Sequence, residues 1–180
     1  MNHYYFSYNK AHRHFIDITL TVETKGESEL KFQLPSWRPG RYELANFAKN
    51  IQKWAAFDED DNALLYKKIT KDCWVVKTKQ NKRIKIKYNY YANELNAGST
   101  YLDEKQLYVN PVNCCLYIVG RELESCSVKL DVPTNYKIAC GLNKKDKTLF
   151  ADNFDQLAEC PFIASNTLKH DNYQINGIIF

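Results

Sequence analysis

The segment Phe15-Ile16-Asp17-Ile18-Thr19-Leu20-Thr21-Val22 alternates apolar with polar side chains from Ile16 onward. Successive side chains of a β-strand point to opposite faces of a sheet, so this pattern predicts a strand with one buried face. The segment Leu30-Lys31-Phe32-Gln33-Leu34 alternates in the same way. Two such neighbours indicate a protein built on half-buried sheets.

Further segments along the chain carry the same β-like character. The expected strands are residues 40–48, 51–57, 63–69, 73–78, 84–92, 107–109, 116–119 and 126–132, and residues 162–180 are β-like as well. A helical turn within residues 45–49 is an alternative to the end of the first of these. We expect residues 79–82 to join two of the strands, 73–78 and 84–92, in a hairpin.

Amphipathic helices are almost absent, and only residues 153–160 resemble a short helix, which ends before Pro161. Many short strands joined by turns predict an all-β fold: an antiparallel β-sandwich or saddle-like sheet assembly with one or two short helices. With 180 residues the chain can form one domain with a proper core. Its 13 tyrosines, 9 phenylalanines and 3 tryptophans favour β-structure.

The charge pattern argues against nucleic acid as a partner. The net charge is +4, and the basic residues of segment 82–88 alternate with apolar ones. This is the pattern of the outer face of one strand, whereas nucleic-acid binding needs a basic groove. The acidic run 58–62 lacks the spacing of a calcium loop, so we expect a solvated turn there.

The N-terminus lacks the apolar core of a signal peptide, and no run reaches transmembrane length. We therefore expect a cytoplasmic protein without a membrane partner. Six cysteines are present without a Cys-x-x-Cys motif. Without an export signal, all six are expected to be reduced thiols.

No catalytic or metal-binding motif is found. His12-x-His14 is the only histidine pair, and His3 and His170 lie far away in the sequence. On one strand face the pair could approach a metal, but zinc needs at least one further ligand. No cysteine lies in a nucleophile motif, and no glycine-rich phosphate loop occurs. We expect no catalytic residue, no metal site and no cofactor in this chain.

The run Leu34-Pro35-Ser36-Trp37-Arg38-Pro39-Gly40-Arg41-Tyr42 predicts a rigid, bent loop, because its prolines restrict φ and its glycine permits conformations that strain other residues. A loop with such bulky side chains is either packed against the protein or offered to a partner. We expect Trp37 to anchor the loop in the core of the domain, with Arg38, Arg41 and Tyr42 directed outward.

A second candidate segment runs from residue 101 to residue 113. Tyr101, Asp103 and Asn110 fall there on expected loops or strand ends. A buried Asn or Asp can orient a ligand amine, although such residues more often cap a turn.

Several segments together carry a family resemblance. They are residues 14–18, 34–42, 54–58, 74–76, 86–92, 101–103, 109–111 and 157–161. In order and spacing they resemble the N-terminal domain of the M61 metallopeptidases, the glycyl aminopeptidase family. The resemblance covers nearly the whole chain, and Trp37-Arg38-Pro39-Gly40-Arg41-Tyr42 is its most specific element.

In that family the N-terminal β domain precedes a thermolysin-like catalytic domain with a zinc-binding His-Glu-x-x-His helix, and a PDZ-like domain usually follows. No histidine of this chain is followed by Glu. The resemblance thus implies that residues 1–180 form a single non-catalytic N-terminal domain. The catalytic and PDZ-like domains, and the zinc, would lie outside this chain. Its partners would be the catalytic domain of the same polypeptide and, through the full enzyme, a peptide substrate.

By analogy, such a domain walls the substrate cleft and helps to fix the free amine of the substrate. The contributors would be the loop 37–42 and the segment 101–113. The alternative is a stand-alone β-sandwich module that binds a peptide or carbohydrate through exposed aromatic side chains. A reading frame that continues beyond Phe180 into His-Glu-x-x-His would favour the peptidase domain.

Overall fold

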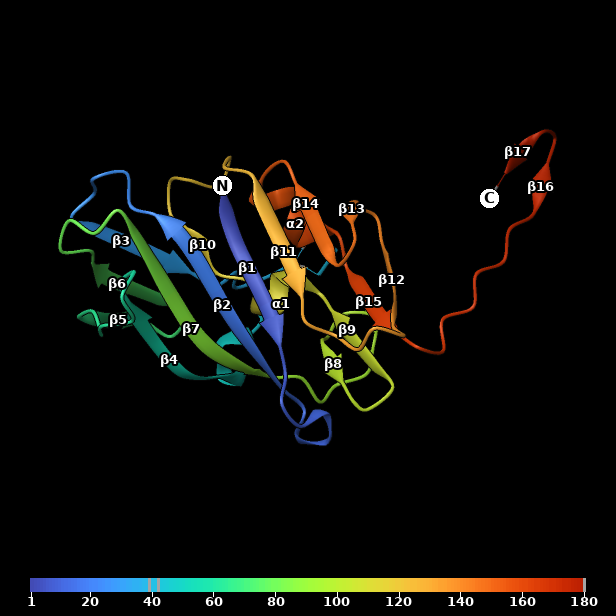
Figure 1. Ribbon diagram of the computed structural model, residues 1–180, viewed down its shortest axis with the longest axis horizontal. Helices are drawn as coiled ribbons and strands as arrows, with labels where there is room; N and C mark the ends of the chain where they lie inside the picture. Colours follow the sequence, from blue (N-terminus) through green and yellow to red (C-terminus); the bar gives the residue numbers. More distant parts are fainter. Residues whose placement is uncertain (39, 42, 180) are drawn as a thin grey trace.

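The computed structural model describes residues 1–38, 40–41 and 43–179. A seven-stranded sheet crosses the molecule (Figure 1). In spatial order its strands are β13 (Asn143–Lys145), β14 (Thr148–Ala151), β11 (Cys126–Leu130), β1 (Asn2–Ser7), β2 (Phe15–Glu23), β7 (Arg83–Tyr91) and β4 (Ile51–Phe57).

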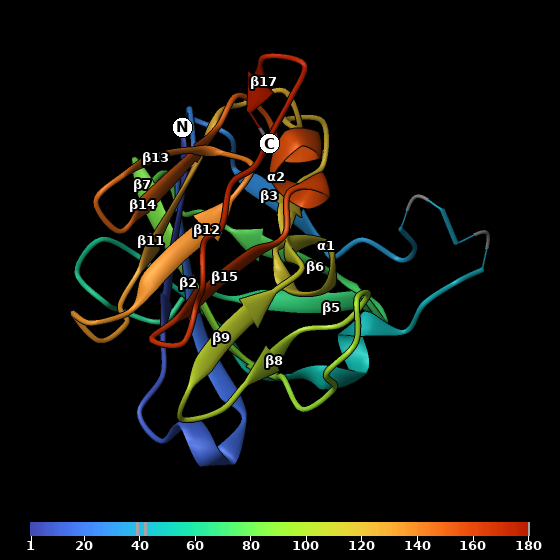
Figure 2. The ribbon, with the colours of Figure 1, turned by 90° about the vertical axis from the view of Figure 1, so that its right-hand side faces the viewer.

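Two four-stranded sheets lie on one side of the large sheet (Figure 2). The first has the order β10 (Tyr117–Ile118), β3 (Glu29–Gln33), β6 (Cys73–Lys77) and β5 (Tyr66–Thr70). The second has the order β12 (Lys137–Cys140), β15 (Phe162–Ser165), β9 (Gln106–Val109) and β8 (Tyr101–Leu102). A small hairpin, β16 (Gln174–Ile175) with β17 (Ile178–Ile179), projects from the body at the C-terminal end (Figure 1).

The alternating segment that opens the sequence forms the middle of the large sheet. Strand β2 pairs antiparallel with β1 on one side and with β7 on the other. Its apolar positions, Ile16, Ile18, Leu20 and Val22, are all buried, while Asp17 points away from the core. The period of two thus predicted both the strand and its buried face.

Aromatic contacts join the layers. The Phe6 ring of the large sheet meets Phe162 of the β9 sheet edge-on, with 5.8 Å between ring centroids. On the other side Trp54 of β4 stacks on Trp74 of β6 at 5.4 Å. Such pairs contribute specific geometry beyond the area that they bury. The three sheets therefore share one hydrophobic core.

The helices are short. They are the 3-10 helices η1 (Ala11–Arg13) and η2 (Phe47–Asn50) and the α-helices α1 (Pro111–Cys114) and α2 (Phe154–Glu159). The Asn153 side chain accepts a hydrogen bond from the backbone N–H of Gln156 at 2.8 Å, which caps α2. This confirms the helix expected at 153–160. All four residues of α1 are buried, and the Tyr88 hydroxyl donates to the carbonyl of Cys114 at 2.6 Å.

The predicted all-β class is confirmed, with differences in pairing. Strand β1 pairs with β11 in parallel, so the large sheet is mixed. The hairpin expected at residues 79–82 is wrong, because β6 pairs with β3 and β5 while β7 pairs with β2 and β4. The turn carries the chain from one layer to the other. Alternation fixes which face of a strand is buried, but it does not fix the neighbouring strand.

Other segments also differ from expectation. Residues 40–48 contain no strand among the described residues, and residues 47–50 form η2, so the helical alternative describes this region better. The sequence reading missed β1, β8, β12, β13, β14, α1 and η1. In the C-terminal segment 162–180, β15 joins a sheet of the body, whereas β16 and β17 pair with each other. The acidic run is the solvated turn that was expected, since Asp58 accepts hydrogen bonds from the backbone N–H groups of Asp60 and Asn62.

All six cysteines are free thiols in the structure, and four of them are buried. Among the described residues, no helix has the length and apolar character needed to cross a membrane.

Candidate functional site

The loop after β3 contributes to two hollows on the surface. Its base is closed by a 2.7 Å hydrogen bond from the Ala45 N–H to the Ser36 carbonyl, and it extends away from the body (Figure 2). Residues 33–37 line one hollow, which we call the Trp37 groove. Arg38, Arg41 and Glu43 line the other, which we call the Arg38 pocket.

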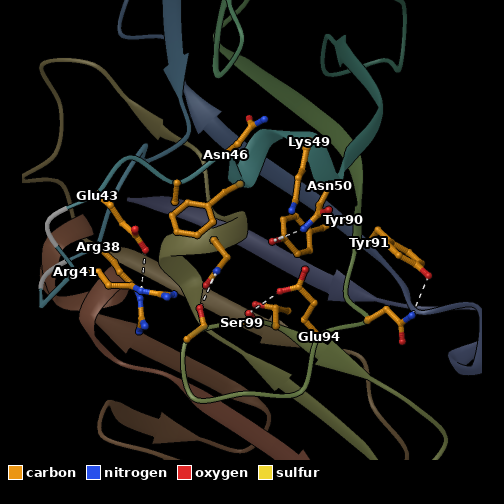
Figure 3. A pocket seen from close by; sticks show the side chains of 16 residues that line it. Arg38, Arg41, Glu43, Asn46, Lys49, Asn50, Tyr90, Tyr91, Glu94 and Ser99 are labelled. Carbon is orange, nitrogen blue, oxygen red and sulfur yellow. Dashed lines mark hydrogen bonds and ion pairs between the residues drawn. The ribbon is translucent and has the colours of Figure 1, made fainter.

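The Arg38 pocket has a volume of about 320 Å³ and is bounded by the loop, η2, the end of β7, residues 93–100 and α1. Arg38 and Glu43 lie at one end and Tyr91 at the other (Figure 3). Arg41 pairs with Glu43 at 3.0 Å. Arg38 forms no ion pair with any described residue. The pocket therefore contains one arginine whose charge the surrounding carboxylates have not neutralised.

Gly98 allows Arg38 to sit this deeply. A Cβ atom placed on Gly98 would lie 2.3 Å from Nη2 of Arg38 and 2.5 Å from its Cζ. Any side chain at position 98 would force the guanidinium to shift from this position. This close approach brings the loop after β3 into contact with residues 93–100, which lie far from it in the sequence.

Two hydrogen-bond acceptors lie in the same pocket. Glu94 accepts from the Ser99 hydroxyl at 3.1 Å (Figure 3). Asn113 is only 3% exposed; its Nδ2 donates to the Gly98 carbonyl at 3.0 Å. Its Oδ1 is buried and has no hydrogen-bond partner among the described residues. A buried acceptor without a donor costs about 1–3 kcal/mol, so this oxygen favours a ligand that donates.

Asn110 holds the pocket wall from behind and does not line it. It is 5% exposed, and its Nδ2 donates to the Ser99 carbonyl at 2.6 Å. Its backbone N–H donates to the Thr100 hydroxyl at 3.1 Å. These bonds fix the segment that carries Glu94 and Gly98.

The other two residues of the 101–113 segment lie outside both hollows. Tyr101 sits on β8 with its ring 5.9 Å from that of His14. Asp103 accepts hydrogen bonds from the backbone N–H groups of Lys105 and Gln106, both at 2.8 Å, and so caps the turn into β9. Partial desolvation, followed by the nearby Asp103 carboxylate, raises the pKa of Tyr101.

The prediction that Trp37 anchors the loop in the core is wrong. Trp37 is 51% exposed. Leu34, which is fully buried, and Phe154 of α2 line the same hollow as Trp37. Arg38 is half-buried in its pocket and Arg41 is exposed. Tyr42 lies outside the described residues.

The Trp37 groove has a volume of about 690 Å³ and combines an apolar floor with acidic side chains. Val112, Tyr117 and Phe154 form the apolar part. The carboxylates that line it are Asp72, Glu122, Asp155 and Glu159. This groove and the Arg38 pocket differ in charge although one loop serves both.

The described residues contain no group of three or more His, Cys, Asp or Glu that could hold a metal. His12 lies in η1 and His14 follows it with φ 59°, so the pair does not share a strand face. His14 Nδ1 instead lies 2.6 Å from the Leu102 carbonyl.

Sequence reasoning missed the residues that give the pocket its chemistry: Glu94, Gly98, Ser99 and Asn113. The one signal in the sequence is the polar segment 93–100 with its single glycine. Asn113 is buried together with the other three residues of α1, and no local pattern in the sequence indicates this burial.

The fold and its two hollows define an all-β domain with ligand-sized surface sites. Residues 3–166 match the Peptidase M61 N-terminal domain, and the chain belongs to this family. The crystal structure of an aminopeptidase N family protein from Idiomarina loihiensis matches with a TM-score of 0.90 and 28% identity over 99% of this chain. The match covers 31% of that protein, so this chain spans about a third of its length.

An M1 zinc metallopeptidase from Deinococcus radiodurans, bound to a Tyr-Ser-Ala substrate, matches with a TM-score of 0.47 and 11% identity, over 99% of this chain and 45% of that one. No curated protein gives a significant match.

Proposed function

We propose that this chain is the single, non-catalytic N-terminal β domain of an M61-type zinc aminopeptidase, and that its Arg38 pocket forms one wall of the substrate cleft. Family membership supports the first part, together with the 31% coverage of the longer aminopeptidase N family protein. The zinc, the catalytic domain and the PDZ-like domain would lie in other parts of the polypeptide. The catalytic domain would dock beside the exposed loop that carries Trp37 and Arg41.

The observation that carries the cleft role is the unpartnered Oδ1 of Asn113 in a pocket that also holds Glu94. The free amino group of a peptide is an ammonium with three donors and a positive charge. A carboxylate and a buried amide oxygen are matched to such a group, since both accept and one is negative. Arg38 would contact the peptide further along, where carbonyl groups need donors.

The test uses a polypeptide that joins this domain to an M61 catalytic domain. Changing Glu94→Gln removes the charge and keeps the shape, so kcat/KM for a glycyl peptide should fall roughly 10- to 100-fold. Glu104→Gln is the matched control, because Glu104 is an exposed carboxylate outside the pocket. Equal activity of the Glu94 and Glu104 variants would contradict the cleft role.

The non-catalytic assignment has its own test. The 180-residue chain alone should release no product from glycyl substrates and should hold no stoichiometric zinc after dialysis. One zinc per chain, measured by metal analysis of the tag-free protein, would overturn the assignment.

A second candidate function is a stand-alone module that binds a peptide or carbohydrate. The exposure of Trp37 favours it, because an anchored tryptophan would not be available to a ligand. The reading frame beyond Phe180 distinguishes the two candidates. A cytoplasmic location stays a prediction.

A further inference from the structure

The Trp37 groove has the composition of an anchor site. Its floor is made of residues that the fold already buries, Leu34 at 0%, Phe154 at 5% and Val112 at 7% exposure. Tyr117 packs on Phe154 with 4.9 Å between ring centroids, which keeps this floor in place. A volume of about 690 Å³ falls in the range of sites that enclose a small ligand or a few side chains.

Trp37 stands at this groove with half of its surface in solvent. The other two tryptophans, Trp54 and Trp74, are 8% and 2% exposed. A large aromatic side chain beside an apolar hollow gains free energy when a partner covers it, and such residues are enriched among the strongest contacts of interfaces. The exposure is therefore a reason to expect an occupant.

The charge of the groove specifies that occupant. Its four carboxylates are accompanied by one basic residue, Lys71, although the whole chain has a net charge of +4. None of the four carboxylates forms an ion pair with a described residue. Burial raises the pKa of Tyr117, and the carboxylate of Glu122 raises it further.

Two of these carboxylates already have local roles. Asp155 lies in the first turn of α2, where a negative charge favours the helix, and Glu122 accepts from the backbone N–H of Gly120 at 3.0 Å. The other two are not explained in this way. Asp72 is 9% exposed, and within the part of the chain that the structure describes its carboxylate pairs only with the Thr70 hydroxyl, at 2.7 Å. Glu159 ends α2, where the helix dipole disfavours a negative charge.

A nearly buried carboxylate without a cation is uncommon, because burial removes its hydration and nothing replaces it. A cation in the groove would supply the missing partner to Asp72 and Glu159. An arginine fits better than a lysine, since its planar guanidinium stacks on aromatic rings and bonds carboxylates with two donors at once. Apolar neighbours of that arginine would cover the floor and Trp37.

We propose that the Trp37 groove binds a polypeptide segment that presents an arginine side chain between apolar residues. The guanidinium lies against Trp37 and Tyr117 and pairs with the carboxylates of Asp72 and Glu159. The proposal stands on this groove alone and does not depend on the role of the Arg38 pocket.

The test uses the 180-residue chain and a pentapeptide, Ala-Leu-Arg-Leu-Ala, acetylated and amidated so that it carries no free amine. Titration followed by calorimetry should show saturable one-to-one binding. The same peptide with citrulline in place of arginine is matched in shape but neutral, and it should bind at least tenfold more weakly. Tryptophan fluorescence should change on binding, because Trp37 is the one exposed tryptophan.

Variants locate the site. Glu159→Gln and Asp72→Asn should each weaken binding of the arginine peptide at least threefold, and Trp37→Ala at least tenfold. Glu104→Gln, an exposed carboxylate outside the groove, should bind like the parent. Glu159 is exposed, so its variant tests the site even if Asp72→Asn fails to fold.

Several results would overturn the proposal. They are equal affinity for the arginine and citrulline peptides, no saturable binding up to millimolar peptide, or unchanged binding by both Glu159→Gln and Trp37→Ala. A concentration-dependent dimer that the peptide does not dissociate would also overturn it, since the occupant would then be a second copy. None of these results bears on the kinetics of Glu94→Gln, so the two proposals can fail separately.

Discussion

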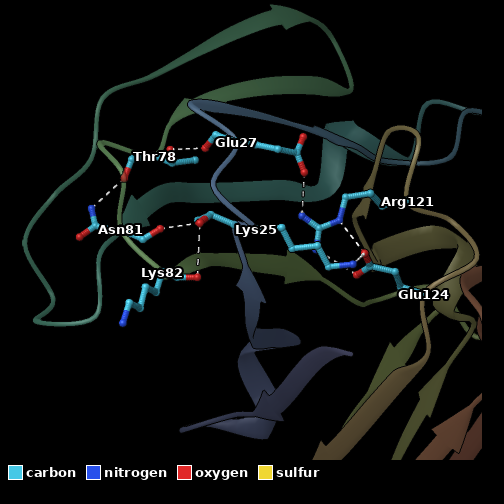
Figure 4. A network of polar contacts seen from close by, with 8 residues as sticks. Lys25, Glu27, Thr78, Asn81, Lys82, Arg121 and Glu124 are labelled. Carbon is cyan, nitrogen blue, oxygen red and sulfur yellow. Dashed lines mark hydrogen bonds and ion pairs between the residues drawn. The ribbon is translucent and has the colours of Figure 1, made fainter.

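Two arginines of this domain, Arg121 and Arg38, are both partly buried, but their surroundings differ. Arg121 binds Glu124 with two hydrogen bonds, at 2.8 and 3.0 Å, and reaches Glu27 at 3.2 Å (Figure 4). Lys25 adds a contact to Glu124 at 2.6 Å. Arg38 has no carboxylate partner among the described residues and packs on Gly98 at the edge of a pocket.

This difference distinguishes polar groups that stabilise the fold from polar groups that remain available to bind a ligand. The Arg121 network joins the turn after β2 to the loop before β11, and Thr78 and Asn81 fix the neighbouring turn (Figure 4). Its charges are satisfied within the chain. In the Arg38 pocket, the guanidinium has no carboxylate partner and the Oδ1 of Asn113 has no hydrogen-bond partner among residues 1–38, 40–41 and 43–179. We therefore expect changes in the network to alter stability and changes in the pocket to alter binding.

Between the Arg121 network and the Arg38 pocket, the larger effect on stability is expected for Arg121→Met. The change leaves Glu124 and Glu27 without their main partner, and removing one member of a buried ion pair is strongly destabilising. The free energy of unfolding should fall by about 2–3 kcal/mol in urea denaturation. Arg38→Met, the matched change in the pocket, should stay within about 0.5 kcal/mol of the parent. Similar losses for both variants would remove the distinction between the two regions.

Acid should weaken the same network. Hydrogen bonds from Arg121, with further help from Lys25, lower the pKa of Glu124 from its ordinary 4.5 to about 2. Because the folded pKa lies below the unfolded one, this stabilisation is fully present above pH 4.5 and is lost as the pH falls toward 2. We expect about 1–3 kcal/mol to disappear over this window, since part of the carboxylate is in contact with solvent.

Urea titrations of the parent and of Glu124→Gln at several pH values between 7 and 2.5 would measure this loss. The variant lacks the titrating carboxylate, so its stability should fall less steeply below pH 4.5 than that of the parent. Parallel acid profiles would show that other carboxylates are responsible.

The sequence predicted what depends on local pattern. The alternation of Phe15–Val22 gave β2 and its buried face, and Asn153 began the short helix α2 as expected. Pairing was harder. The strands on either side of residues 79–82 are close in sequence yet belong to different sheets, because each one has better partners elsewhere in the chain.

The candidate site could be predicted only in part. The proline-bounded loop meets residues 93–100, since Arg38 lies on Gly98, and Asn110 of the 101–113 segment donates a hydrogen bond to Ser99 beside that glycine. Glu94 and Asn113 line the same pocket because of the tertiary fold, so no spacing in the sequence indicates that they belong to one site. The orientation of Trp37 was mispredicted, because bulk and rigidity do not indicate which side of a loop faces the core.

The smallest effect on stability is expected at Trp37. This residue extends the comparison between side chains that stabilise the fold and side chains that remain free to bind a ligand. Trp37 is 51% exposed, whereas Trp74 is 2% exposed and stacks on Trp54. Truncating a buried aromatic costs roughly 3–5 kcal/mol through lost burial and a cavity. Trp74→Ala should therefore unfold at a much lower urea concentration than the parent.

Trp37→Ala should change the free energy of unfolding by no more than about 0.5 kcal/mol, because half of the side chain is already exposed to solvent. The same variant should lose most of the fluorescence that acrylamide quenches in the parent, since the two remaining tryptophans are buried. A large drop in the melting temperature of Trp37→Ala would show that its buried half packs against the core, as an anchor does. Trp37 would then also maintain the shape of the groove, so weaker peptide binding by Trp37→Ala would no longer locate the site. Glu159→Gln alone would then test the peptide-binding proposal.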